Sequence, residues 1–215
     1  MKLYDISLPI SNDLFVWPGD PSVSLIQAKS ISKGDQCNVS QLQMGVHTGT
    51  HIDAPYHFIN DGARVESIPM ETFIGTCLVI EVDSKTLVEK QDLLKYKIGE
   101  HSRILLKTRN TDLWANNVKS FDRNFVALAI DAAQYLIEMN ILLVGIDYLS
   151  IESFHSANNP VHKLLLKNNI TILEGLNLSK IKPGVYELIC LPLKLQGCEG
   201  SPARVLLREL ADYIK

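Results

Sequence analysis

The sequence predicts an α/β fold in which a mixed sheet is combined with helices in a single domain over residues 1–215. Stretches typical of strands outnumber those typical of helices, and at least two helical stretches lie between strands, as in α/β domains. A length of 215 residues allows one domain with a substantial core. Hydrophobic residues make up 46% of the chain and charged residues 21%, which is typical of a globular protein.

The elements expected in the first half are short apolar or β-branched runs for strands and apolar residues at helical spacing for helices. Strands are expected at residues 2–10, 22–29, 38–47, 76–82 and 103–108, and a helix at residues 89–97. The run at 38–47 alternates between apolar and polar residues. Its apolar residues Leu42, Met44 and Val46 should therefore pack on the core, and its other face should deliver His47 to a cavity.

The second half shows the same strand signals and two clearer helices. Strands are expected at residues 125–130, 141–146, 170–173, 185–193 and 203–209, and helices at residues 131–140 and 161–168. Asp131 is a suitable N-cap for the first of these helices, and Pro160 leads into the second. The polar stretch at 109–124 is expected to be irregular and to lie near the rim of a pocket.

The stretch from His47 to Phe58 reads H-T-G-T-H-I-D-A-P-Y-H-F and contains three histidines and one aspartate. Neutral imidazole and carboxylate are ligands that zinc, manganese and iron accept. In an extended chain, His47 and Asp53 would lie about 20 Å apart, too far for one ion held by bonds of about 2 Å. The backbone must therefore bend between them, and Gly49 permits the bend. The alternative, ordinary polar residues on a strand and loop, fits a cluster of four ligand-type side chains poorly.

Other residues have weaker claims to a site. His162 lies in the first turn of a predicted helix and Glu174 follows a predicted strand, which are places where α/β proteins build sites. Each alone could be a solvated surface residue. Asp147 and His155 have a similar, weaker claim. Trp17, in the turn W-P-G-D, could be either a core residue or an aromatic wall of a substrate pocket.

Several classes of protein are disfavoured by bulk properties. The net charge of −3 gives no electrostatic case for binding nucleic acid or an anionic membrane. No apolar run has the length of a membrane helix, and the N-terminus does not resemble a signal peptide. The four cysteines have no C-x-x-C spacing and read as reduced thiols. We therefore expect a cytoplasmic protein that binds neither nucleic acid nor a membrane.

The sequence resembles the cyclase family of metal-dependent hydrolases, which includes bacterial kynurenine formamidases (arylformamidases) and isatin hydrolases. The resemblance runs along most of the chain. It is carried by W-P-G-D at 17–20, H-T-G-T-H-x-D-A-P-x-H-F at 47–58 followed by N-D-G, G-I-D at 145–147, His162 with Glu174, Y-E-L-I-C-L-P-L at 186–193 and G-S-P-A-R at 200–204.

The resemblance implies a swivelling β/β/α domain that assembles as a homodimer or homotetramer and binds two divalent metal ions. The ions are usually zinc, with manganese possible in the family. By motif, one ion would be held by His47, His51 and Asp53. The second would be held by Asp53, which would bridge the ions, together with His162 and Glu174.

The resemblance also implies roles for two further residues. His57 matches the family's proton donor and acceptor, and Trp17 matches a substrate-contacting position. The implied substrate is an aromatic amide, N-formyl-L-kynurenine, whose hydrolysis to L-kynurenine and formate belongs to tryptophan degradation.

Two alternatives remain open at this stage. One is another hydrolase of the same family, such as an isatin-hydrolase-like enzyme acting on a lactam or lactone. Trp17 favours the formamidase, and the pair His162 and Glu174 favours two ions over one. The other is a metal-binding protein without catalysis. Structural zinc sites usually close with four protein ligands, often cysteines, whereas here three ligands leave His57 free and no cysteine is near in sequence.

Overall fold

The main sheet contains eight strands within residues 1–210, which are the residues that the computed structural model describes. Residues 211–215 of the predicted domain lie outside the described part. The strand order is β1-β12-β11-β5-β7-β9-β10-β4, and an additional pairing of β12 with β4 brings the two ends of the sheet together. The strands are β1 (Leu3–Asp5), β4 (His51–Asp53), β5 (Ile74–Glu81), β7 (Arg103–Lys107), β9 (Leu143–Ile146), β10 (Thr171–Glu174), β11 (Gly184–Pro192) and β12 (Gly200–Glu209).

The sheet is mixed, which confirms the predicted class. The pairs β5–β7, β7–β9 and β9–β10 are parallel, whereas β4, β11, β12 and β1 pair with antiparallel neighbours. The central parallel strands are apolar along nearly their whole length because they are buried on both faces. For example, Leu105 packs in one core cluster while its neighbours Ile104 and Leu106 pack in the other.

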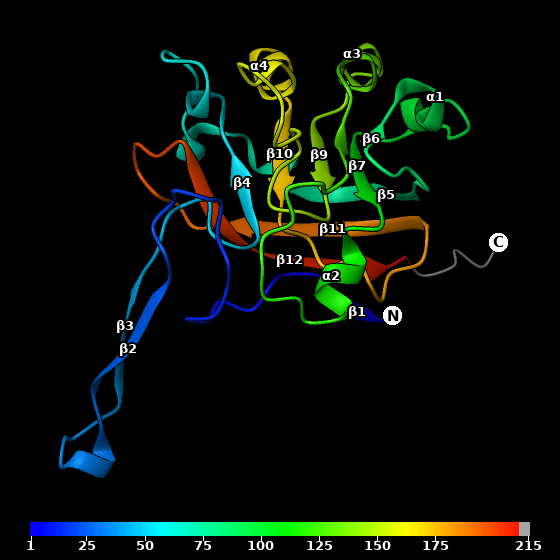
Figure 1. The fold of residues 1–215 in the computed structure, drawn as a ribbon. Helices are drawn as coiled ribbons and strands as arrows, with labels where there is room; N and C mark the ends of the chain where they lie inside the picture. The colour runs from blue at the N-terminus through cyan, green and yellow to red at the C-terminus, as the bar shows by residue number, and fades with distance from the viewer. Residues whose placement is uncertain (211–215) are drawn as a thin grey trace.

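Three helices lie in a row along one side of the parallel strands (Figure 1). They are α1 (Lys90–Leu93), α3 (Ile130–Glu138) and α4 (Pro160–Lys167). Leu136 of α3 and Leu165 of α4 are fully buried and share a core cluster with Ile104 of the sheet. Strands β11 and β12 pack on the other side, where Leu188 and Leu207 join a second cluster with Leu105. The resulting order of layers is helices, parallel strands and antiparallel strands.

Several predicted elements differ in extent or position. The helix expected at 89–97 is reduced to α1, so that Leu94 is exposed while Leu93 is buried. Asp131 is not an N-cap: α3 starts at Ile130 after Ala129, and Asp131 lies in its first turn. The stretch 109–124 is not irregular throughout, because it forms a helix, α2 (Thr111–Ala115), whose Trp114 is buried.

The remaining elements are short. The strand expected at 125–130 is only β8 (Ala127–Leu128), which pairs with β6 (Leu87–Val88) outside the main sheet. Short 3-10 helices lie at Ile31–Lys33, Pro55–His57, Val65–Ser67, Met70–Thr72 and Ile98–Glu100. Among residues 1–210, no helix combines the length and apolar character needed to cross a membrane.

Strands β2 (Ser24–Lys29) and β3 (Val39–Gln43) form a separate two-stranded hairpin that projects away from the body of the molecule (Figure 1). We call residues 24–43 the arm. Every residue of both strands is exposed. The prediction that the alternating run at 38–47 packs on the core is therefore wrong: Leu42 is 49% exposed, and the strand ends four residues before His47.

Candidate metal centre

The middle of the histidine-rich motif is the three-residue strand β4. Ile52 is fully buried and belongs to the apolar core, so its neighbours His51 and Asp53 point to the opposite side of the strand. The register of the antiparallel pair places His51 opposite Glu174 of β10. Residues directly opposite one another in such a pair share a face. The core thus holds β4 by its central residue and turns two polar side chains toward Glu174.

The expected bend of the backbone occurs at Gly49, whose φ angle is 67°. Gly175, with a φ of 69°, packs directly on the Gly49 backbone, where a Cβ atom would overlap the Gly49 carbonyl group. The hydroxyl of Thr50 donates to the Gly175 carbonyl at 2.6 Å and holds the two segments together. The bend returns His47 to the site, and its ring lies on Gly200 of β12, where a Cβ would collide with it.

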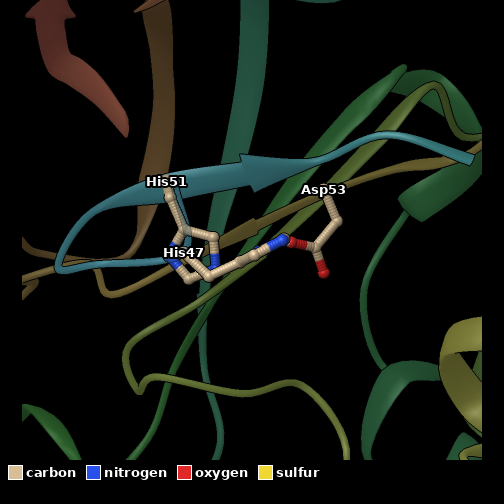
Figure 2. A group of neighbouring side chains, drawn as sticks. All are labelled: His47, His51 and Asp53. Atoms are coloured by element: carbon tan, nitrogen blue, oxygen red, sulfur yellow. The ribbon is translucent and has the colours of Figure 1, made fainter. Parts of the chain in front are cut away.

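Five predicted ligand residues meet in two overlapping groups. In the first, His47 Nδ1 lies 2.8 Å and His51 Nε2 3.5 Å from Asp53 Oδ1. In the second, His162 Nε2 lies 3.6 Å from Asp53 Oδ2 and 3.3 Å from Glu174 Oε1. Figure 2 shows the three side chains of the first group converging.

The sizes of both groups suit a metal ion. Two ligand atoms bound to one ion at about 2.0–2.1 Å with tetrahedral geometry lie about 3.3 Å apart. The ligand atoms of each group lie within 4.8 Å of one another, and Asp53 directs one oxygen to each group. The donor set contains only imidazole and carboxylate, which borderline divalent ions accept.

Asp53 itself provides the clearest sign of a missing partner. Its side chain is 1% exposed, and neither carboxylate oxygen has a hydrogen-bond donor in suitable geometry among the described residues. The imidazoles beside Asp53 offset part of its lost hydration, but a buried carboxylate whose lone pairs have no aligned donor remains unfavourable. Cations bound on both sides of Asp53 would replace that hydration, so the residues present fit a metal centre.

In the absence of a metal ion, protonated histidines balance the negative charges of the buried carboxylates. Burial alone would lower the pKa of His51 and His162, but the surrounding carboxylates outweigh this effect. Asp53 and Glu174 raise the pKa of His51 to about 10, and Glu152 and Glu174 raise that of His162 to about 10. An ion entering the site must therefore displace protons from imidazoles.

His57 lies beside the ligand groups but belongs to neither of them. It ends the 3-10 helix at Pro55–His57, and its ring stacks on that of His47 with centroids 4.0 Å apart. Burial, together with the charges of His47 and His162, lowers the pKa of His57. His57 is therefore a neutral imidazole near neutral pH, which can accept and return a proton.

A cavity of about 290 Å³ opens onto these side chains. Its apolar walls include Trp17, Phe58, Leu149 and Phe154. Trp17 also packs against other aromatic rings, with centroid distances of 5.1 Å to Phe121 and 5.3 Å to Phe154. Trp17 is therefore both a packed residue of an aromatic cluster and a wall of the cavity, which were the two alternatives that the sequence left open.

The structure also separates residues that sequence reasoning had grouped or missed. Neither Asp147 nor the exposed His155 lines the cavity. Burial raises the pKa of Asp147 to about 7, and its carboxylate instead accepts hydrogen bonds from Thr108 and Thr111. Glu152, which sequence reasoning missed, lies in the cavity wall next to His162. Its only sequence signal is a position shortly after the expected strand at 141–146.

Comparison with known proteins agrees with this geometry. The sequence model of a family described as "Putative cyclase" matches residues 4–153. A kynurenine formamidase of Bacillus anthracis is 36% identical over 209 residues, which cover 97% of this chain and 98% of the relative. One of Bacillus cereus (strain ATCC 14579) is 35% identical over 206 residues, covering 96% and 97% of the two chains.

Solved structures have the same fold. One described as a potential metal-dependent hydrolase with cyclase activity has a TM-score of 0.83 and 36% identity, with 96% of each chain covered. An isatin hydrolase bound to thioisatinate has a TM-score of 0.82 over 96% of this chain and 91% of the other; at 23% identity it is similar in fold alone.

The fold, the ligand groups and these similarities define a metal-dependent hydrolase, which confirms the predicted class of enzyme. The family match covers more than half of the chain, and the relatives are more than 30% identical over nearly all of it. The chain therefore belongs to the cyclase family.

Proposed function

We propose that this protein hydrolyses N-formyl-L-kynurenine to L-kynurenine and formate. The observation that carries the proposal is the position of His57. This neutral imidazole stacks on His47 of the first ligand group and lines the cavity that has aromatic walls. The similarity to kynurenine formamidases over 97% of the chain supports the choice of an aryl formamide. A single domain over residues 1–215 would contain the whole site.

The proposed cofactor is a pair of divalent ions, most suitably zinc, with manganese as the alternative. His47, His51 and Asp53 would hold one ion, and Asp53, His162 and Glu174 the other. When bound, such ions lower the pKa of a coordinated water toward about 7 and polarise a carbonyl oxygen.

The side chains of the cavity supply the remaining chemistry. His57 accepts a proton from the attacking water at an imidazole nitrogen and gives it to the leaving anilinic nitrogen. Its lowered pKa keeps it unprotonated in the free enzyme and thus ready to accept that proton. Trp17 and Phe154 provide flat apolar surfaces on which the aryl ring of the substrate can stack.

A substrate panel on the metal-free protein, reloaded with zinc or with manganese, tests the proposal. N-formyl-kynurenine should be hydrolysed at a kcat/KM at least tenfold above isatin and simple esters. A preference for isatin or a lactone would make the protein a different hydrolase of the family. Bound metal without turnover of any formyl amide, lactam or ester would instead identify a metal-binding protein.

We further propose that the protein forms a homodimer or homotetramer. An isolated two-stranded hairpin has little stability in water, so the arm needs a partner surface. The arm exposes apolar side chains that contact with a second copy would bury: Leu25, Ile26, Ile31, Val39 and Leu42. In sedimentation experiments Ile26→Lys should yield a smaller species, whereas Leu142→Lys, at an exposed site on the body, should not.

The proposed location is the cytoplasm. Cys37, Cys77, Cys190 and Cys198 all have free thiols in the structure, which suits a reducing compartment. Fractionation of cells that express the tagged protein tests this location.

A further inference from the structure

Glu152 links the start of helix α4 to the candidate metal centre. It is buried, and its Oε2 atom accepts hydrogen bonds from the backbone N–H groups of Val161, at 2.9 Å, and His162, at 3.0 Å. Its Oε1 atom accepts from the hydroxyl of Ser156 at 2.7 Å. The N-cap residue Asn159 makes no side-chain capping bond, so Glu152 satisfies the first turn of α4 in its place.

The same carboxylate also faces the His162 ring. Glu152 Oε2 lies 3.3 Å from His162 Nδ1, while Nε2 on the other side of the ring faces Asp53 and Glu174. A carboxylate can only accept, so Nδ1 must carry a proton to bond with Glu152. With that proton on Nδ1, Nε2 would be the atom that binds an ion in the second ligand group, once the ion has displaced the proton on Nε2.

His51 shows the same arrangement with a weaker partner. Its Nδ1 atom lies 3.0 Å from the backbone carbonyl of Gly49, while its Nε2 faces Asp53 and Glu174. A carbonyl oxygen fixes the tautomer in the same way but carries no net charge. A carboxylate partner raises the basicity of a ligating histidine more strongly, and loss of such a partner lowers metal affinity about 10–100-fold.

We propose that Glu152 is a positioning residue that fixes His162 with its proton on Nδ1 and thereby strengthens binding of the ion shared by Asp53, His162 and Glu174. This inference rests on the proposed function, because it takes His162 as a ligand. It goes beyond that function in giving the buried Glu152 a role that α4 capping alone does not require.

Glu152→Gln separates the two roles of this side chain. The amide oxygen of glutamine can still accept from the N–H groups of α4, but the negative charge is lost. Zinc is titrated into the metal-free protein in competition with a chromophoric chelator. The ion held by His47, His51 and Asp53 should bind with wild-type affinity. The ion held by Asp53, His162 and Glu174 should bind about 10–100-fold more weakly. Glu100→Gln, at an exposed site, removes one charge without touching the centre and should leave both affinities unchanged.

A second readout follows the proton itself. In the zinc-loaded wild type, ¹⁵N NMR of histidine side chains should show a protonated Nδ1 in His162 whose proton exchanges slowly. In Glu152→Gln that proton should exchange faster and its resonance should shift. Equal affinities for the second ion together with an unchanged Nδ1 signal would overturn the proposal and reduce Glu152 to a helix cap. If the wild type bound no second zinc, the proposed metal centre itself would fail.

Discussion

Gly175 packs on the backbone of Gly49 so closely that no side chain can stand at position 175. The two glycines belong to the segments that carry the ligand groups: Gly49 lies between His47 and His51, and Gly175 follows Glu174. Both have positive φ angles, which residues with a Cβ rarely adopt. Their contact therefore sets the distance between the histidine-rich motif and the end of β10.

Gly175→Ala tests this contact. The substitution adds backbone strain and forces the two segments apart. We therefore expect the free energy of unfolding to fall by more than about 4 kcal/mol and the bound metal to be lost. Gly197→Ala is the matched control, because Gly197 also has a positive φ of 80° but has open space around it. It should cost only about 1 kcal/mol and retain metal. Urea unfolding and elemental analysis measure both quantities, and similar losses in the two variants would refute the role of the contact.

His57→Ala should retain the bound metal and lose activity. Removal of a positioned acid–base group lowers kcat by about 10²–10⁴. His101→Ala, at a histidine that does not line the cavity, should leave kcat unchanged. Metal content is measured alongside the rate. If metal is lost and the remaining rate follows metal content, then His57 is a ligand and its proposed role is wrong.

Asp53→Ala should abolish binding of both ions, because Asp53 directs one oxygen to each ligand group. Glu174→Ala provides the comparison, since it removes a member of the second group only. It should retain about one ion per chain. Inductively coupled plasma mass spectrometry of the dialysed proteins gives the counts, and full metal content in Asp53→Ala would exclude a bridging role.

Without metal, the protein should become less stable as the pH rises into the alkaline range. In the metal-free protein the pKa values of His51 and His162 are about 10, well above the unfolded value near 6.5. A raised pKa stabilises the folded state below the unfolded pKa, and this contribution is lost as pH rises through the folded pKa.

Chelator-treated protein should therefore lose stability steadily between about pH 6.5 and 10, whereas zinc-loaded protein, whose imidazoles carry no such protons, should not. Urea unfolding across this range measures the difference. Parallel profiles for the two forms would show that protons and metal do not compete for these histidines.

The first ligand group could be predicted from sequence because its members are neighbours in the chain and the bend at Gly49 is a local necessity. His162 and Glu174 could be connected to it only through the family resemblance, since the pairing of β10 with β4 is a long-range contact. Glu152 had only the weak signal of its position after an expected strand, because its contacts depend on α4 being folded beside the loop that carries it.

The position of the arm could not be predicted for a related reason. An alternating pattern predicts a strand with two unlike faces, but it does not say what covers the apolar one. Leu42 alternates like a core residue, yet within residues 1–210 β3 pairs only with β2, and Leu42 stays exposed. The polar stretch at 109–124 shows a different limit, since it contains a helix whose Trp114 the fold buries.

The partners of β4 have a consequence for biogenesis. The histidine-rich motif leaves the ribosome early, but its neighbours β10 and β12, which supply Glu174 and the glycine under His47, are made only in the last third of synthesis. A nascent chain that has exposed the motif alone lacks His162 and Glu174, so the second ligand group can form only after β10 has been made. Both ligand groups can therefore exist together only late in the synthesis of this chain.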